Sequence, residues 1–431
     1  MPGSSSPPRV DAPGASDYDA VITEGLPMQD ELIHDWNFED GGRPRPRQVM
    51  LDDETLRDGL QSPSVIDPPI GKKRELLHLM DTLGIETANV GLPGAGPRAE
   101  SDVLDLCREI ASSKLSIQAN CAARTIVKDI DPIIRVTQTT GVPIEACLFI
   151  GSSPIRQYAE GWDDEFLVRQ SIEAIAYAVG NGLRVLYVTE DTSRARPETL
   201  RRLYAEAVRA GASRVCVADT TGHATPEGAA RLILFVRSVL DAVGGQHIGI
   251  DWHGHRDRGL GLINGLAAFE AGATRVHGTA LGIGERSGNA EIDLLLVNLK
   301  LLGWIDRDLT HLGAYCRLAS EALGRPIPEN YPVIGQDAFE TATGVHAAAV
   351  IKAFKKGDAW LADRIYSGVP AGDFGLSQRI RVGPMSGKSN VIYWLESHGV
   401  EPTEERVERI FAAAKLSNRL LADGEIQALC G

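Results

Sequence analysis

Charged side chains that could bind a metal ion and an anion are concentrated in residues 51–61 (LDDETLRDGLQ) of this chain. Arg57 and Asp58 are adjacent there, and an apolar lead-in at residues 48–51 predicts a strand directly before them. In α/β folds, ligands bind just beyond the carboxyl ends of strands. A guanidinium and a carboxylate at such a point predict one group for an anionic substrate and one for a metal ion.

A second group of potential ligands lies at residues 251–255 (DWHGH). Residues two apart on a strand point to the same face, so His253 and His255 are expected to project together. Two imidazoles and a carboxylate make a site for a divalent metal, and Asp58 can supply the carboxylate. The alternative is that two polar residues merely cap a strand. The combination of ligands from two predicted strands favours the metal site.

A glycine-rich segment, residues 278–289 (GTALGIGERSGN), follows the last predicted strand of this region. No GK[ST] follows the glycines of this segment, so a P-loop is rejected here. Glycines let the backbone approach a ligand closely, and Asn289 can offer its side-chain carbonyl oxygen to a metal ion.

The elements that must position these residues alternate between short β-branched runs and amphipathic stretches of helical length. The predicted strands are residues 49–52, 86–90, 115–119, 144–149, 185–189, 214–217, 247–252 and 275–277. Eight strands with following helices over roughly 250 residues predict an α/β fold of the TIM (β/α)8 barrel type. An open doubly wound sheet is the alternative, but no glycine-rich fingerprint follows the first strand.

The chain divides into three predicted parts. Residues 1–46 form a disordered tail, rich in Ser, Pro and Gly up to about residue 17, and an N-terminal arm. Residues 47–302 form the catalytic barrel. Residues 303–431 form a mainly helical extension that ends in a predicted helix over residues 404–422 and contributes to the active site and a dimer.

Composition excludes several classes of function. A net charge of −14, without a dense Lys/Arg run, argues against nucleic acid as a partner. Six scattered cysteines without a CxxC pair predict buried, reduced thiols. We expect no membrane partner and a cytoplasmic location, because no segment reaches ~18 uninterrupted apolar residues and the N-terminus lacks an apolar signal core.

The segments DETLRDGLQ, HxH and GIGERSGNA together resemble the DRE-TIM metallolyases, in particular the Claisen-condensing 2-isopropylmalate, citramalate and homocitrate synthases. The resemblance covers about residues 49–390. It implies a divalent metal (Zn, Mn or Mg) and the condensation of acetyl-CoA with a 2-oxo acid to a 2-alkylmalate-type product and CoA. The implied metal ligands are Asp58, His253, His255 and Asn289.

The same resemblance implies roles for further residues. Arg57 polarises the 2-oxo acid's carbonyl, Glu190 and His346 are both candidates for the general base, and Tyr366 is a candidate partner of His346. The implied substrate-binding residues are Gln61, Arg156, Thr220 and Asn89. The acidic residues that precede the RD pair, Asp52, Asp53 and Glu54, are interpreted as supports at the strand end.

Three departures from the family pattern concern the substrate, and one of them is residues 255–257, which read HRD where many synthases have HND. Asn89 replaces the Glu of an EVG triplet, and Arg156 stands where a His is frequent. Arg156 is either a partner for a second anionic group of the substrate or a solvated surface residue.

Other functions are also open. A carbon–carbon lyase or aldolase similar to 3-hydroxy-3-methylglutaryl-CoA lyase is the main alternative, but that branch carries a cysteine in the loop at residues 278–289, which contains none. A catalytically silent barrel is the other. A homodimer is expected, in which the C-terminal segment reaches the partner's barrel. Feedback inhibition through a further C-terminal regulatory domain is not expected at this length.

Overall fold

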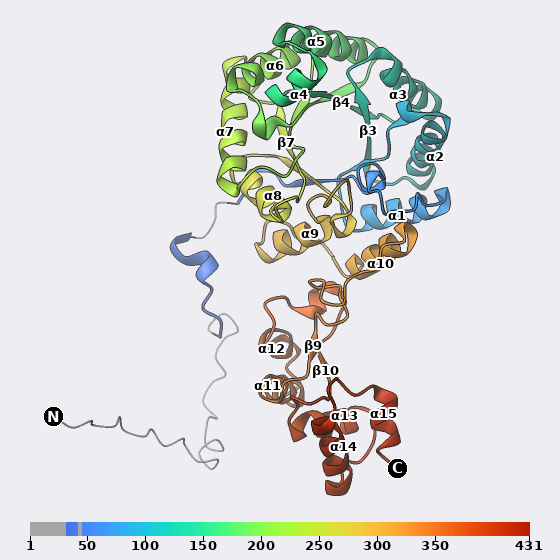
Figure 1. Cartoon of the computed structure of the whole chain (residues 1–431), viewed down its shortest axis with the longest axis vertical. Coiled ribbons are helices and arrows are strands. Elements are labelled where there is room, and N and C mark those ends of the chain that lie inside the picture. Colours follow the sequence, from blue (N-terminus) through green and yellow to red (C-terminus); the bar gives the residue numbers. More distant parts are fainter. Residues whose placement is uncertain (1–31, 42–44) are drawn as a thin grey trace, which may run out of the picture. The chain divides into compact units, whose positions relative to one another are not determined.

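Eight parallel strands form a closed barrel in which each strand pairs with the next and β1 pairs with β8 (Figure 1). The strands are β1 (Met50–Asp53), β2 (Thr87–Asn89), β3 (Gln118–Arg124), β4 (Glu145–Gly151), β5 (Arg184–Glu190), β6 (Arg214–Asp219), β7 (Gly249–Gly254) and β8 (Arg275–Gly278). The prediction of a TIM barrel is confirmed, and all eight predicted strands are present.

This computed structural model describes residues 32–41 and 45–431, and the predicted tail at residues 1–17 lies outside them. Residues 45–431 form one compact unit. Short 3-10 helices are η2 (Trp36–Gly41), η3 (Gly59–Gln61), η4 (Pro93–Ala95), η5 (Thr192–Arg194), η6 (Ala280–Gly282) and η7 (Ala371–Phe374).

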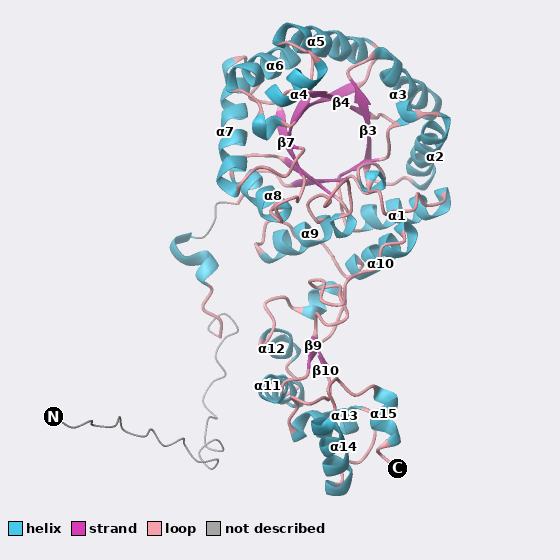
Figure 2. Cartoon of the chain, viewed as in Figure 1, coloured by secondary structure: helices cyan, strands magenta, loops and turns pink. Residues whose placement is uncertain are grey.

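Helices surround the barrel on its outer side, as Figure 2 shows. They are α1 (Ile70–Thr82), α2 (Pro97–Ser113), α3 (Val127–Thr140), α4 (Pro154–Glu160), α5 (Asp164–Gly180), α6 (Pro197–Arg209), α7 (Pro226–Ala242), α8 (Gly261–Glu270) and α9 (Ile292–Leu301). Within the described ranges, every helix is too short or too polar to traverse a lipid bilayer. All six cysteines are free and buried, as predicted.

Side chains alternate between the two faces of each strand. On β7, Ile250 and Trp252 belong to the apolar core between strands and helices, whereas Asp251 points into a polar network inside the barrel. β3 was predicted at residues 115–119 but spans Gln118–Arg124, so both its start and its end lie later in the chain than predicted. The strand continues through the polar residue Asn120, because the side-chain amide of Asn120 is buried and donates to Asp52 Oδ1 at 2.5 Å.

The polar network fills the interior of the barrel near the amino ends of the strands. Arg275 is 2% exposed, and its guanidinium donates to Asp251 Oδ2 at 2.7 Å and to Glu145 Oε2 at 2.6 Å. Arg214 donates to the other oxygen of Asp251 at 2.9 Å. Because several buried charges are paired here, the strands are tied to one another across the barrel as well as along their edges.

The C-terminal extension is mainly helical, as predicted. It contains α10 (Leu312–Leu323), α11 (Gly344–Lys355), α12 (Ala359–Arg364), α13 (Lys388–Ser397), α14 (Glu404–Leu416), α15 (Asp423–Ala428) and a small sheet of β9 (Glu340–Thr341) and β10 (Arg379–Ile380). The predicted helix over residues 404–422 was too long. It ends at Leu416 because Ser417 adopts an extended backbone, with φ −76° and ψ 151°.

We expect Arg275→Met to destabilise the protein by about 3–5 kcal/mol, because Glu145 loses its cation while remaining buried. The unfolding midpoint in denaturant measures this loss. Arg202→Met is the control, because Arg202 forms an exposed ion pair with Glu165 and its loss should leave the midpoint almost unchanged. The double variant Arg275→Met/Glu145→Gln should recover part of the loss. Equal midpoints for the Arg275 and Arg202 variants would contradict the structural role of the network.

Candidate metal centre and active site

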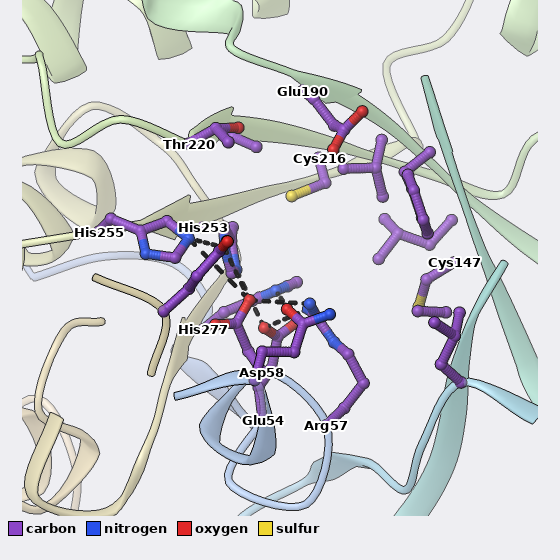
Figure 3. A pocket seen from close by; sticks show the side chains of 18 residues that line it. Glu54, Arg57, Asp58, Cys147, Glu190, Cys216, Thr220, His253, His255 and His277 are labelled. Carbon is purple, nitrogen blue, oxygen red and sulfur yellow. Dashed lines mark hydrogen bonds and ion pairs between the residues drawn. The ribbon is translucent and has the colours of Figure 1, made fainter. Parts of the chain in front are cut away.

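A cavity of about 180 Å³ lies at the carboxyl ends of the barrel strands (Figure 3). Its lining residues are Glu54, Arg57, Asp58, Gln61, Leu92, Ala122, Cys147, Phe149, Leu186, Val188, Glu190, Cys216, Ala218, Thr220, His253, His255, His277 and Glu285. Ligand sites of TIM-barrel enzymes occupy this end of the barrel. We therefore treat this cavity as the candidate active site.

The structure brings together three of the predicted metal ligands. The Nε2 atoms of His253 and His255 are 3.3 Å apart, and Asp58 Oδ2 lies 3.8 Å from the first and 4.0 Å from the second. Two nitrogens that each bind one divalent ion at about 2.1 Å are separated by roughly this distance. Burial lowers the pKa of His255 to about 4, assisted by His253, so this imidazole is neutral near pH 7, as a ligand must be.

Asn289, the fourth predicted ligand, is also in place. Its Nδ2 donates to Asp58 Oδ1 at 2.8 Å, and its buried Oδ1 has no hydrogen-bond partner. This approach requires a glycine at position 284, because a Cβ there would lie 2.2 Å from Asn289 Nδ2. A buried carbonyl oxygen without a partner next to two imidazoles and a carboxylate fits a divalent metal ion.

Glu54 lies at the centre of the site, although the sequence led us to interpret it as a strand-end support. Its carboxylate accepts from Arg57 at 2.5 Å, and it lies 3.1 Å from His253 Nδ1 and 3.0 Å from His277 Nδ1. Burial favours protonation of Glu54, but Arg57 and His253 outweigh it and hold the pKa well below its usual range. A carboxylate at His253 Nδ1 leaves Nε2 available to a metal ion.

His277 was also missed, although it ends a predicted strand two residues after Arg275 and therefore shares its inward face. Its Nε2 lies 3.0 Å from Asp251 Oδ2, and its Nδ1 contacts Glu54. Burial opposes the charged form, but Asp52, Asp251 and Glu54 raise the pKa of His277 to about 10. With both nitrogens donating to carboxylates, His277 supports Glu54 and is not available as a metal ligand.

Four other predicted residues line the cavity. Arg57 donates to Asp58 Oδ2 at 2.8 Å, while its buried Nε has no partner. Burial raises the pKa of Glu190, and Arg156 and Arg57 oppose this. Thr220 Oγ1 accepts from the backbone N–H of Asp191 at 2.8 Å. Gln61 lies at an exposed position on the rim.

The remaining predicted residues do not line this cavity. Asn89 is buried, and its side-chain oxygen accepts weakly from the Gly91 N–H at 3.4 Å. Arg156 is half-exposed, pairs with Glu160 at 3.1 Å and lines a neighbouring cavity. His346 and Tyr366 lie in the C-terminal extension with their rings stacked, 4.2 Å between centroids and 27° between planes. Both are largely exposed.

We expect Glu54→Gln to weaken Mn²⁺ or Co²⁺ binding by about 10–100-fold, because groups that orient a ligating histidine have effects of this size. Isothermal titration of the metal into chelator-treated protein measures the affinity. Glu285→Gln is the matched control, since Glu285 lines the same cavity at an exposed position without contacting a ligand. Unchanged affinity in a folded Glu54→Gln protein would contradict the positioning of His253 by Glu54.

Known proteins resemble most of this chain. Residues 48–318 match the HMGL-like family model. The chain is 33% identical over 375 residues to homocitrate synthase AksA of Methanopyrus kandleri, covering 86% of this chain and 88% of that protein. It is also 33% identical over 373 residues to a probable 2-isopropylmalate synthase of the same organism, covering 86% of this chain and 70% of that protein.

A hydroxymethylglutaryl-CoA lyase from Pseudomonas aeruginosa has the same fold, with a TM-score of 0.53 and 19% identity over 64% of this chain and 93% of that one. The resemblance to the Claisen-condensing synthases that the three sequence segments predicted is confirmed by the sequence relatives. With a family model that covers more than half of its length, this chain belongs to the HMGL-like family.

Proposed function

We propose that this chain is a metal-dependent acyltransferase that condenses acetyl-CoA with a 2-oxo acid and releases CoA. The observation that carries the proposal is the convergence of Asp58, His253, His255 and the unpartnered oxygen of Asn289 beside Arg57. A lyase is the weaker candidate, because the loop at residues 278–289 contains no cysteine and the lyase likeness concerns the fold alone. A catalytically inactive barrel would not need this set of buried polar atoms.

Arg57 is the residue proposed to meet the substrate's carbonyl oxygen. Two of its nitrogens are held by Glu54 and Asp58, which orient the guanidinium, and the buried Nε–H remains free to donate. A preorganised donor in a water-poor site stabilises the negative charge that develops on this oxygen. A divalent ion held by Asp58, His253, His255 and Asn289 would polarise the same carbonyl as a Lewis acid.

A general base must remove a proton from the methyl group of acetyl-CoA. Glu190 lines the cavity, and its raised pKa brings it closer to the range useful for proton transfer near neutral pH. His346, stacked on Tyr366, is the other candidate. The resulting enolate carbon bonds to the carbonyl carbon of the 2-oxo acid, and water cleaves the thioester, so the products are a 2-alkylmalate-type acid and free CoA.

We also propose a cytoplasmic homodimer in which His346 and Tyr366 of one subunit complete the cavity of the other. Both rings are exposed, and neither lines the cavity described above. Two residues that the family resemblance assigns to catalysis therefore lie together on a surface where a second barrel can reach them. Besides the second subunit, this arrangement requires only the small-molecule substrates as partners.

The proposal is tested by thiol release from acetyl-CoA with a panel of 2-oxo acids in the presence of Mn²⁺, Mg²⁺ or Zn²⁺. We expect release with at least one acid and a decrease of about 10²–10³-fold in kcat for Arg57→Met, because a preorganised donor to the developing alkoxide is lost. Arg202→Met, which removes only an exposed ion pair with Glu165, should retain activity. Absence of release with every acid and metal would refute the acyltransferase.

Mixing two inactive variants tests the shared site. Arg57→Met damages the barrel side, and His346→Ala damages the extension, so heterodimers contain one site with neither change. We expect subunit exchange to restore up to about a quarter of the wild-type rate, because half of the dimers are mixed and each has one intact site. No recovery after verified exchange would place His346 in its own subunit's cavity or outside catalysis.

A further inference from the structure

The two halves of the cavity differ in chemistry. Charged residues from the β1, β7 and β8 side form the half that contains the candidate metal ligands. The other half comes from β3 to β6 and is lined by Ala122, Cys147, Phe149, Leu186, Val188, Cys216 and Ala218. In Figure 3 the side chains drawn between Cys216 and Cys147 carry no oxygen or nitrogen.

Strand register explains why the apolar half is continuous. Cys147 pairs with Leu186 in register, and Phe149 pairs with Val188, so four inward side chains of β4 and β5 lie side by side. Cys147, Leu186 and Cys216, with Val188 packed against them, form an apolar cluster separate from the core between strands and helices. This cluster is called the apolar wall below.

The cationic side chains that line the cavity are already paired with carboxylates. Of the described lining residues, Arg57 is the only lysine or arginine, and it is held between Glu54 at 2.5 Å and Asp58 at 2.8 Å. Glu190 lies at the open end of the apolar half and already has a raised pKa from burial. A substrate carboxylate placed against the wall would therefore be desolvated without an opposite charge.

Two arginines near the mouth of the cavity also do not supply an unpaired cation. Arg156 and Arg194 line the neighbouring cavity together with Glu190. Arg156 pairs with Glu160 at 3.1 Å, and Arg194 donates to both oxygens of Asp191 at 2.8 and 2.7 Å. Both guanidinium groups are already engaged by carboxylates outside the apolar wall.

The volume suits a small group. An apolar cavity of about 150 Å³ binds a molecule the size of benzene, and the whole cavity here measures about 180 Å³. The bulk of CoA must therefore lie outside it. The group that can occupy the apolar half is the side chain of the 2-oxo acid.

We propose that the 2-oxo acid used by this chain has a small uncharged aliphatic side chain, which packs on the apolar wall. 2-Oxo dicarboxylic acids are then poor substrates. The inference rests on the proposed condensation and names its substrate class. It is independent of the relatives' names, which include both a homocitrate synthase and a 2-isopropylmalate synthase.

Matched acids test this with the wild-type protein. 2-Oxopentanoate and 2-oxoglutarate differ by a methyl group in place of a carboxylate, and 2-oxobutyrate and oxaloacetate differ in the same way. We expect kcat/KM for thiol release to be at least about 100-fold higher for the uncharged member of each pair, because its partner leaves a buried carboxylate unpaired. Equal or higher values for the dicarboxylates would overturn the inference, and loss of that activity in Arg156→Gln would assign the second carboxylate to Arg156.

A binding measurement separates this inference from the proposed function. If no acid releases CoA, the condensation is refuted, and calorimetric titration of the Mn²⁺-loaded protein with 2-oxopentanoate and 2-oxoglutarate still decides the substrate class. Tighter binding of 2-oxopentanoate supports the apolar wall, and tighter or equal binding of 2-oxoglutarate overturns it.

A pair of variants tests where in the cavity the side chain of the 2-oxo acid binds. Val188→Lys adds a cation to the wall and should raise the affinity for 2-oxoglutarate relative to 2-oxopentanoate at least about tenfold, compared with the uncharged Val188→Met control. An unchanged ratio in folded Val188→Lys protein would show that the substrate side chain lies elsewhere, against this proposal.

Discussion

Hydrogen bonding between β1 and β8 closes the barrel, and the contacts of Asp58 with the other candidate metal ligands depend on this closure. In the register of the two strands, Asp52 lies opposite His277 and Asp53 opposite Gly278. The loops that follow them therefore meet, and Asn289 reaches Asp58 although 231 positions separate the two residues. An open sheet built from the same strands would leave the two halves of the ligand set at opposite edges.

The candidate metal centre also requires that several buried charges compensate one another. Glu54 contacts Arg57, His253 and His277. His277 in turn contacts Asp251, which pairs with Arg214 and Arg275 inside the barrel. Removing such groups from water is unfavourable, and their mutual attraction offsets this only when the geometry is good. The result is a site whose ligand orientations are set by the barrel interior before any metal or substrate binds, which is the condition for strong electrostatic stabilisation of a reacting oxygen.

The same closure gives the cavity its asymmetry. Strands β7, β8 and β1 carry histidines and carboxylates at their inward positions, whereas β4 and β5 carry Cys147, Phe149, Leu186 and Val188 at theirs. A 2-oxo acid has one anionic end and one variable side chain, so a cavity divided in this way matches both ends of one molecule. The candidate metal ligands and the apolar wall come from different strands, so a substitution in one need not disturb the other.

The sequence by itself predicted the barrel, and it pointed to Asp58, His253, His255 and Asn289 as candidate metal ligands with Arg57 beside them. These predictions depend on local regularities: the period of two along a strand places His253 and His255 on one face, and alternating strands and helices specify the parallel barrel. The end of α14 was missed because Ser417 and the residues directly after it carry no strong stop signal, such as proline or glycine at the C-cap.

Only the tertiary structure decided which polar residues meet in the cavity. Asp52, Asp53 and Glu54 are all buried, but only Glu54 contacts a predicted metal ligand, His253. Its partners His253 and His277 lie some 200 positions away in the chain. Asn89 and Arg156 lie outside the cavity for the same kind of reason. The direction of a side chain just beyond a strand is set by the neighbours that closure brings to it, and these neighbours are distant in sequence.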